Sequence, residues 1–190
     1  MTIEPDEPMA TTGISVLVLA LGNVLLGDDG LGPAAVSRLE RDYRTPAGVR
    51  LEDGGTLGLS LLGLIADSRH VILVDAVRAD AAPGTLVRLD GEEVPAAVRD
   101  RLSPHQVGVA DLLEAARLMN RYPQTVTLLG LVPDSLELAI VRSKAVDDGL
   151  EALVAAVVGE VQRLGYGLER ETAAAARDRP IHNLTRHFGM

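Results

Sequence analysis

Three continuous apolar runs constrain the fold of this chain more than any other feature. They are Ser15–Leu21, His70–Val77 and Thr125–Val132, and in their interiors apolar residues follow one another with little polar alternation. A strand with one wet face alternates apolar and polar residues, whereas a continuous apolar run is typical of a strand buried on both faces of a parallel sheet. Two shorter strands are predicted at Val49–Glu52 and Thr85–Leu89.

Segments with the spacing of amphipathic helices separate these strands. They are Pro33–Tyr43, Leu57–Ala66, Val107–Met119 and Val146–Leu164. The alternation predicts an α/β fold, a three-layer sandwich in which a mostly parallel, five-stranded twisted sheet carries helices on both faces. We expect one domain over residues 14–168, preceded by a disordered leader over 1–13 and followed by a polar C-terminal tail over 169–190.

Composition narrows the possible chemistry. The 190 residues include no cysteine, which excludes disulfides, thiolate metal sites and a cysteine nucleophile. The net charge of −9 argues against nucleic acid or an anionic membrane as a partner. The first basic residue is Arg38, so the apolar run near the start does not resemble a signal peptide, and we expect a cytoplasmic protein.

In a parallel sheet, ligands bind beyond the carboxyl ends of the strands, so candidate site residues are expected in the loops at that edge. The loop after the first strand contains two adjacent acids, Asp28 and Asp29. A helix N-cap would account for one of them but not for both. Asp75 ends the second long strand, where a carboxylate can act as a ligand. The segment Asp53-Gly54-Gly55-Thr56 follows a short strand and reaches the same edge.

His105 is the histidine best placed to join these acids. It lies in Ser103-Pro-His-Gln106, where Ser103 and Gln106 fit a capping box and the proline suits the first helical position. The positive end of a helix disfavours imidazolium, which leaves a neutral imidazole suited to a metal. Asp29, Asp75 and His105 would together suit a divalent metal with open coordination positions.

Two other functions remain open at this point. Gly30-Leu-Gly32-Pro-Ala-Ala35 fits a dinucleotide-binding pattern, but it starts nine residues after Leu21, contains a proline and lies beside two acids. A phosphoacceptor receiver domain would use Asp28, Asp29 and Asp75 with Lys144, yet this lysine does not directly follow a strand. Either alternative is a non-proteolytic α/β domain.

The motifs, in this order and spacing, resemble those of the hydrogenase maturation endopeptidases. They are Gly22-Asn-x-Leu-x-x-Asp28-Asp29-Gly30-x-Gly32, Asp53-Gly-Gly-Thr56, Val74-Asp75-Ala76, Ser103-Pro-His-Gln106, and Leu128–Pro133 with Ser135-Leu-Glu137. The resemblance implies an endopeptidase that removes a C-terminal extension from the large-subunit precursor of a [NiFe]-hydrogenase after nickel insertion. It implies that Asp29, Asp75 and His105 are catalytic metal ligands, and that Asp53, with Gly54, Gly55 and Thr56, engages the substrate.

The resemblance and the residues are compatible with one hypothesis about the metal. The three ligands would engage nickel that the substrate already carries, so that cleavage depends on correct metal loading. The alternative is another divalent metal bound before the substrate arrives. The expected partner is the precursor alone, with the chain a monomer or weak dimer. A protein that binds the precursor without cutting it is a further alternative.

Overall fold

The structure, a computed structural model, describes residues 13–55, 60–94 and 107–171. Its main sheet has five strands in the order β3-β1-β4-β6-β5. The strands are β1 (Ile14–Ala20), β3 (Val49–Asp53), β4 (Ser68–Ala76), β5 (Leu86–Asp90) and β6 (Thr125–Leu131). All neighbouring pairs are parallel except β5 with β6, which is antiparallel. The predicted α/β class and mostly parallel sheet are therefore confirmed.

The three apolar runs form the three central strands β1, β4 and β6. Their residues are buried on both faces of the sheet, which explains why their sequences lack alternation. β5, at the edge, alternates exposed and half-buried residues along its length. The pairing is continuous, with Val18 opposite Ile72 and Ile72 opposite Thr127.

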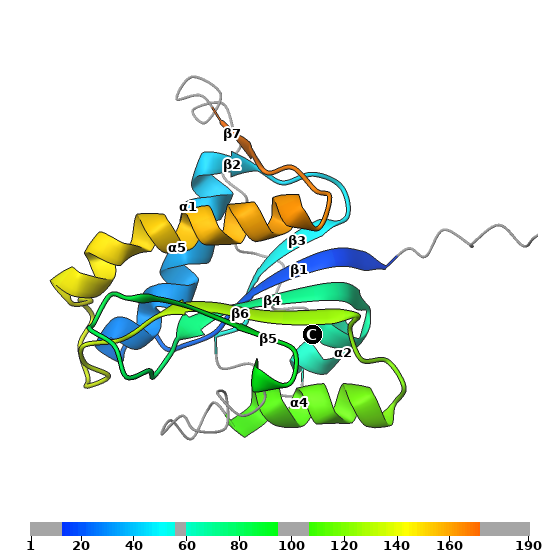
Figure 1. The fold of residues 1–190 in the computed structure, drawn as a ribbon, viewed down its shortest axis with the longest axis horizontal. Helices are drawn as coiled ribbons and strands as arrows, with labels where there is room; N and C mark the ends of the chain where they lie inside the picture. Colours follow the sequence, from blue (N-terminus) through cyan, green and yellow to red (C-terminus); the bar gives the residue numbers. More distant parts are fainter. Residues whose placement is uncertain (1–12, 56–59, 95–106, 172–190) are drawn as a thin grey trace, which may run out of the picture.

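Helices cover both faces of the sheet, as Figure 1 shows. One face carries α1 (Leu31–Asp42) and α5 (Lys144–Arg163), and the other carries α2 (Leu61–Ala66) and α4 (Val107–Leu118). A short 3-10 helix, η1 (Gly27–Gly30), precedes α1. The predicted three-layer arrangement is confirmed.

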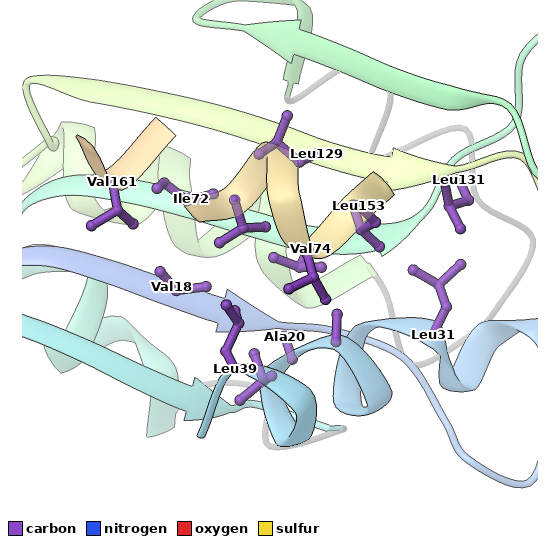
Figure 2. Packing of buried hydrophobic residues seen from close by; sticks show 14 of the residues in the cluster. Val18, Ala20, Leu31, Leu39, Ile72, Val74, Leu129, Leu131, Leu153 and Val161 are labelled. Atoms are coloured by element: carbon purple, nitrogen blue, oxygen red, sulfur yellow. The ribbon is translucent and has the colours of Figure 1, made fainter. Parts of the chain in front are cut away.

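Each helical layer encloses its own apolar core. Between the sheet and the layer of α1 and α5, Val18 and Val74 pack with Leu39, Leu153 and other aliphatic side chains (Figure 2). The opposite core lies between the sheet and the layer of α2 and α4 and is built from leucine, valine and isoleucine in the same way. The central strands are thus covered on both sides.

The helix boundaries differ from the sequence expectation in instructive ways. α5 begins at Lys144 rather than Val146, because Ser143 is the N-cap and its hydroxyl accepts a hydrogen bond from the Val146 N–H. The apolar stripe starts only at the first buried residue, so periodicity alone placed the start too late. Residues 57–59 of the predicted Leu57–Ala66 helix lie outside the described residues.

The predicted C-terminal tail begins inside the folded domain. β7 (Glu169–Arg170) pairs antiparallel with β2 (Tyr43–Arg44), and the Glu171 N–H donates to the Asp42 carbonyl. The domain therefore extends slightly past the expected boundary at residue 168, while residues 172–190 and 1–12 lie outside the described residues. None of the helices in the described ranges is long and apolar enough to cross a membrane.

Candidate functional site at the carboxyl edge of the sheet

The chain connections leave β1 and β4 in opposite directions at the edge where both strands end. After β1 the chain passes through α1 on one face, whereas the connection from β4 to β6 passes through α4 on the other. Neighbouring parallel strands whose connections leave in opposite directions form a topological switch point, which is the usual ligand site of such sheets. A functional role for the predicted acids requires that they lie at this switch point.

Asp75 is the next-to-last residue of β4 and lies at this edge. It is fully buried, and its Oδ1 accepts a hydrogen bond from the Ala76 N–H at 2.7 Å. Leu73 and Val77, two residues before and two residues after Asp75, both pack in the core under α2 and α4. Because side chains two residues apart in a strand point to the same face, Asp75 lies on that face of the sheet. The strand fixes both the position and the direction of this carboxylate.

A glycine makes room beside Asp75. Gly130 on β6 is paired in register with Asp75, and a Cβ at Gly130 would lie 2.0 Å from the Asp75 backbone oxygen. Any side chain here would push β6 away from β4. The sequence Leu-Leu-Gly-Leu therefore contains a glycine because the two backbones approach closely next to the candidate site.

Asp29 comes from η1, which contacts β4. It is 2% exposed, and its Oδ2 accepts a hydrogen bond from the Asn23 N–H at 2.7 Å. Asn23 in turn accepts the Leu25 N–H with its side-chain oxygen, which closes a tight turn. The loop thus holds the second buried carboxylate against the strand that carries Asp75.

Asp28 has a different role from the one the sequence suggested. Neither acid caps α1, whose N-cap is Gly30 with no side-chain hydrogen bond. Instead the buried Asp28 carboxylate accepts backbone N–H groups from Asp134 at 2.8 Å, Ser135 at 3.2 Å and Ser143 at 2.6 Å. These donors belong to the loop between β6 and α5, so Asp28 fastens that loop to the one that carries Asp29.

The hydrogen bonds also set the charge of Asp28. Burial by itself would raise the pKa of this carboxyl, but the backbone N–H groups of Ser143, Asp134 and Ser135 outweigh it and lower the pKa below its ordinary value. Asp28 is therefore an anion whose charge is offset by three donors. Sequence reasoning missed this contact because its partners lie more than a hundred residues away, with no spacing signal to mark them.

The predicted substrate-binding segment lies beside the same edge. Asp53 is paired with Ala20 at the end of β1, is exposed, and accepts the Gly55 N–H with its Oδ1 at 3.0 Å. Gly55 has a positive φ of 41°, but Gly54 approaches the protein's own backbone, donating its N–H to the Ala20 carbonyl. Thr56 lies outside the described residues.

His105 also lies outside the described residues, so the structure does not place the predicted third ligand. Within 13–55, 60–94 and 107–171, no three histidine, aspartate or glutamate side chains gather as a metal site. The structure brings two buried carboxylates, Asp29 and Asp75, to adjoining elements. Buried carboxylates typically pair with or coordinate a cation, and hard oxygen donors of this kind fit a divalent metal.

The residues behind the two alternative functions have other roles. Gly32 is needed because a Cβ there would lie 2.3 Å from the Leu21 carbonyl and 2.5 Å from that of Val74, so the glycine lets α1 pack on the sheet. Lys144, the lysine a receiver domain would need, is exposed at the start of α5 and forms an ion pair with Asp148. Fold and site together define an α/β protein with an acidic centre at the switch point of its sheet.

The sequence of this chain is similar to those of known proteins. A sequence model described as hydrogenase maturation protease, HycI, matches residues 33–160. The Hydrogenase 2 maturation protease of Escherichia coli K12 is 40% identical over 151 residues, which cover 79% of this chain and 92% of that protein. The hydrogenase expression/formation protein HupD of Rhodobacter capsulatus is 43% identical over 123 residues, covering 64% of this chain and 59% of that protein.

The fold agrees with these relatives. The solved structure of the hydrogenase maturating endopeptidase HybD from E. coli matches with a TM-score of 0.79 at 39% identity, covering 83% of this chain and 98% of that one. This chain belongs to the hydrogenase maturation protease family, and with that family it is a protease and hence a hydrolase. The resemblance drawn from the motifs is thereby confirmed.

Proposed function

We propose that this protein removes the C-terminal extension of a [NiFe]-hydrogenase large-subunit precursor after nickel has been inserted. The observation that carries the proposal is the pair of buried carboxylates, Asp29 and Asp75, at the switch point of a sheet in a chain of this family. We propose His105 as the third group of the site. α4 begins at Val107, two residues further along the chain, and it runs opposite to β6 (Figure 1), so the start of α4 lies at the same edge.

The two carboxylates are held ready for chemistry before the substrate arrives. One oxygen of each is fixed by a backbone N–H, that of Asn23 for Asp29 and that of Ala76 for Asp75. Groups fixed in this way need little reorganisation during a reaction. Because both side chains are almost wholly buried, their attraction for a cation is stronger than it would be in water.

Hydrolysis requires water to attack the peptide carbonyl carbon, the C–N bond to break and the departing amine to gain a proton. The described residues supply carboxylates, one of which would accept a proton from the attacking water and deliver it to the departing amine, so that the protons balance. A metal at these ligands would supply carbonyl polarisation and a more acidic water. The absence of cysteine removes a thiolate nucleophile, which favours this direct attack by water.

We propose that the metal is the nickel that the precursor carries. The substrate would then bring the soft, thiolate-bound metal, while this protein contributes hard carboxylates and one imidazole. Cleavage would depend on metal loading without a separate sensor. The alternative, another divalent metal resident in the protease, predicts stoichiometric metal that survives dialysis of the purified protein.

Substitution of the two carboxylates tests the assignment. Asp29→Asn and Asp75→Asn keep the size of each side chain but remove its charge, and each should lower the cleavage rate by about 100-fold or more. The rate is measured by the mobility shift of nickel-loaded precursor on a gel. Asp148→Asn, at an exposed acid on α5, is the matched control and should cleave at the wild-type rate.

A maturation assay with Asp75→Asn can contradict this assignment. If Asp75→Asn still supports full maturation of the hydrogenase, the protein acts by binding the precursor and not by cutting it. Thermal unfolding of each variant shows whether a lost activity reflects lost folding. The proposed cytoplasmic location follows from the sequence and remains a prediction.

A further inference from the structure

Five aliphatic side chains are exposed together on two loops next to the candidate site. Val24 and Leu25 lie in the first loop and are 57% and 53% exposed. Leu138, Ile140 and Val141 lie in the loop between β6 and α5 and are 83%, 82% and 71% exposed. We refer to these five side chains as the apolar platform. Clustered apolar exposure of this kind commonly marks a binding surface.

Backbone hydrogen bonds join the two loops that carry the platform. The Gly27 N–H donates to the Ala139 carbonyl at 2.7 Å, and the Ala139 N–H donates to the Leu25 carbonyl at 3.0 Å. This pairing forms a short parallel bridge between Leu26 and Ala139. The side chains on either side of the bridge are therefore presented from one local framework.

Asp28 fixes the framework a second time. Its carboxylate accepts the N–H groups of Asp134, Ser135 and Ser143, which lie on both sides of Leu138–Val141 in the chain. A loosely held loop can expose apolar residues by accident, but this loop is fastened at both ends and in the middle. Exposed apolar residues in a constrained loop are better explained by a partner than by chance.

The platform is continuous with the acidic site. Val24 and Leu25 occupy the turn between Asn23 and Asp29, whose side chain accepts the Asn23 N–H. A Cβ at Gly30, the residue after Asp29, would lie 3.2 Å from the Val24 Cα, so the turn packs directly against η1. When a peptide bond of a substrate lies at Asp29, the substrate residues next to that bond are therefore within reach of the platform.

We propose that the apolar platform binds an apolar segment of the protein substrate next to the peptide bond that is cut. The inference rests on the proposed function, because that function supplies a protein substrate at Asp29. A second copy of this chain is a weaker occupant, since stable interfaces use about 20–30 residues on each side and the platform has five exposed side chains. A transient substrate contact needs far less surface.

The test uses the double variant Leu138→Gln/Ile140→Gln. Both side chains are exposed, so the thermal midpoint should stay within about 2 °C of the wild-type value. We expect KM for nickel-loaded precursor to rise about tenfold while kcat changes little, because the platform contributes binding and no chemistry. The same substitutions in an Asp75→Asn background should weaken precursor binding about tenfold in calorimetry.

The matched control is Leu118→Gln/Met119→Gln. These residues are 89% and 50% exposed and lie at the C-terminal end of α4, near the amino ends of the strands and away from Asp29. Their substitution removes similar apolar surface and should leave KM unchanged. A KM that rises equally in both double variants would indicate a general effect of surface polarity and overturn the inference.

Other outcomes separate this inference from the proposed function. If the wild-type protein cleaves the precursor and Leu138→Gln/Ile140→Gln does so with the same KM, the platform is not a substrate site although the protease assignment stands. If the wild-type protein does not cleave but the double variant binds precursor less tightly, the platform stands and the proposed function fails. The inference about the platform is also overturned if the wild-type protein does not bind the precursor at all. It is overturned as well if the wild-type protein sediments as a dimer and the double variant as a monomer.

Discussion

Removal of the Asp28 carboxylate should destabilise the protein through the loop between β6 and α5. Asp28→Ala leaves the backbone N–H groups of Asp134, Ser135 and Ser143 without their acceptor. It leaves the loop that carries Leu138–Val141 joined to the one that carries Asp29 by backbone hydrogen bonds alone. The variant therefore tests whether the two loops are one structural unit.

The structure sets the size of the effect. A hydrogen bond to a charged group contributes about 1.5–3 kcal/mol, and three of them would give about 4.5–9 kcal/mol if they added. Asp134 and Ser135 are exposed residues, so water can replace part of what they lose. We therefore expect Asp28→Ala to lower the free energy of unfolding by about 3 kcal/mol, and Asp28→Asn, which keeps one oxygen acceptor, by about half as much.

Urea unfolding followed by circular dichroism measures this difference. Asp134→Ala is the control, because it removes a neighbouring acid but keeps the backbone N–H that Asp28 accepts. It should change the free energy of unfolding by less than about 0.5 kcal/mol. If Asp28→Ala is equally mild, the three hydrogen bonds do not hold the loop.

The pH dependence provides a second test of Asp28. Its pKa is lowered from the ordinary 3.8, so its contribution to stability is present above that pH and is lost as the pH falls through the lowered pKa. The difference between wild type and Asp28→Asn should be constant from about pH 5 upward and shrink on acidification. A difference that is the same at about pH 2 as at about pH 6 would refute the charge-based explanation.

Two further predictions concern the sheet and its edge. Gly130→Ala should lower the free energy of unfolding by more than about 2 kcal/mol, because a Cβ at this position would lie 2.0 Å from the Asp75 backbone oxygen. The control is Gly159→Ala in α5, where a Cβ meets open space and the substitution should be neutral or stabilising. Thermal unfolding of both variants measures the difference. Glu160→Gln should lower the free energy of unfolding by about 1–2 kcal/mol at pH 7, because hydrogen bonds from Arg163 and Arg88 lower the pKa of Glu160 from 4.5 to about 2. That loss should fade as the pH falls from about 4.5 toward 2, as measured by urea unfolding, and a loss independent of pH would contradict it.

The central strands were predictable because burial on two faces leaves an unambiguous pattern. The observed β1, β4 and β6 agree to within two residues at each end with the predicted runs Ser15–Leu21, His70–Val77 and Thr125–Val132. The antiparallel direction of β5 was not predictable in the same way, since alternation marks a wet face and carries no information about strand direction. β2 and β7 are two-residue strands with polar or amphipathic residues, which no periodicity could reveal.

The candidate site was predictable only in part, because the sequence indicates where strands end but not which distant loops meet there. Asp75 and Asp29 could be expected at one edge because every parallel strand ends there. Asp28 could not be understood from its neighbours in the chain, since its three donors come from another loop. The apolar platform could not be predicted, because the sequence shows neither the exposure of Leu138, Ile140 and Val141 nor the bridge that brings their loop beside the first one.

The most direct test of the central claim is the intact mass of the precursor after incubation with this protein. Nickel-loaded and nickel-free precursors are incubated in parallel with the wild-type protein, and the mass of each large subunit is measured by mass spectrometry. We predict that the nickel-loaded precursor loses its C-terminal extension while the nickel-free precursor keeps its full mass. Equal cleavage of both, or cleavage of neither, would contradict the account.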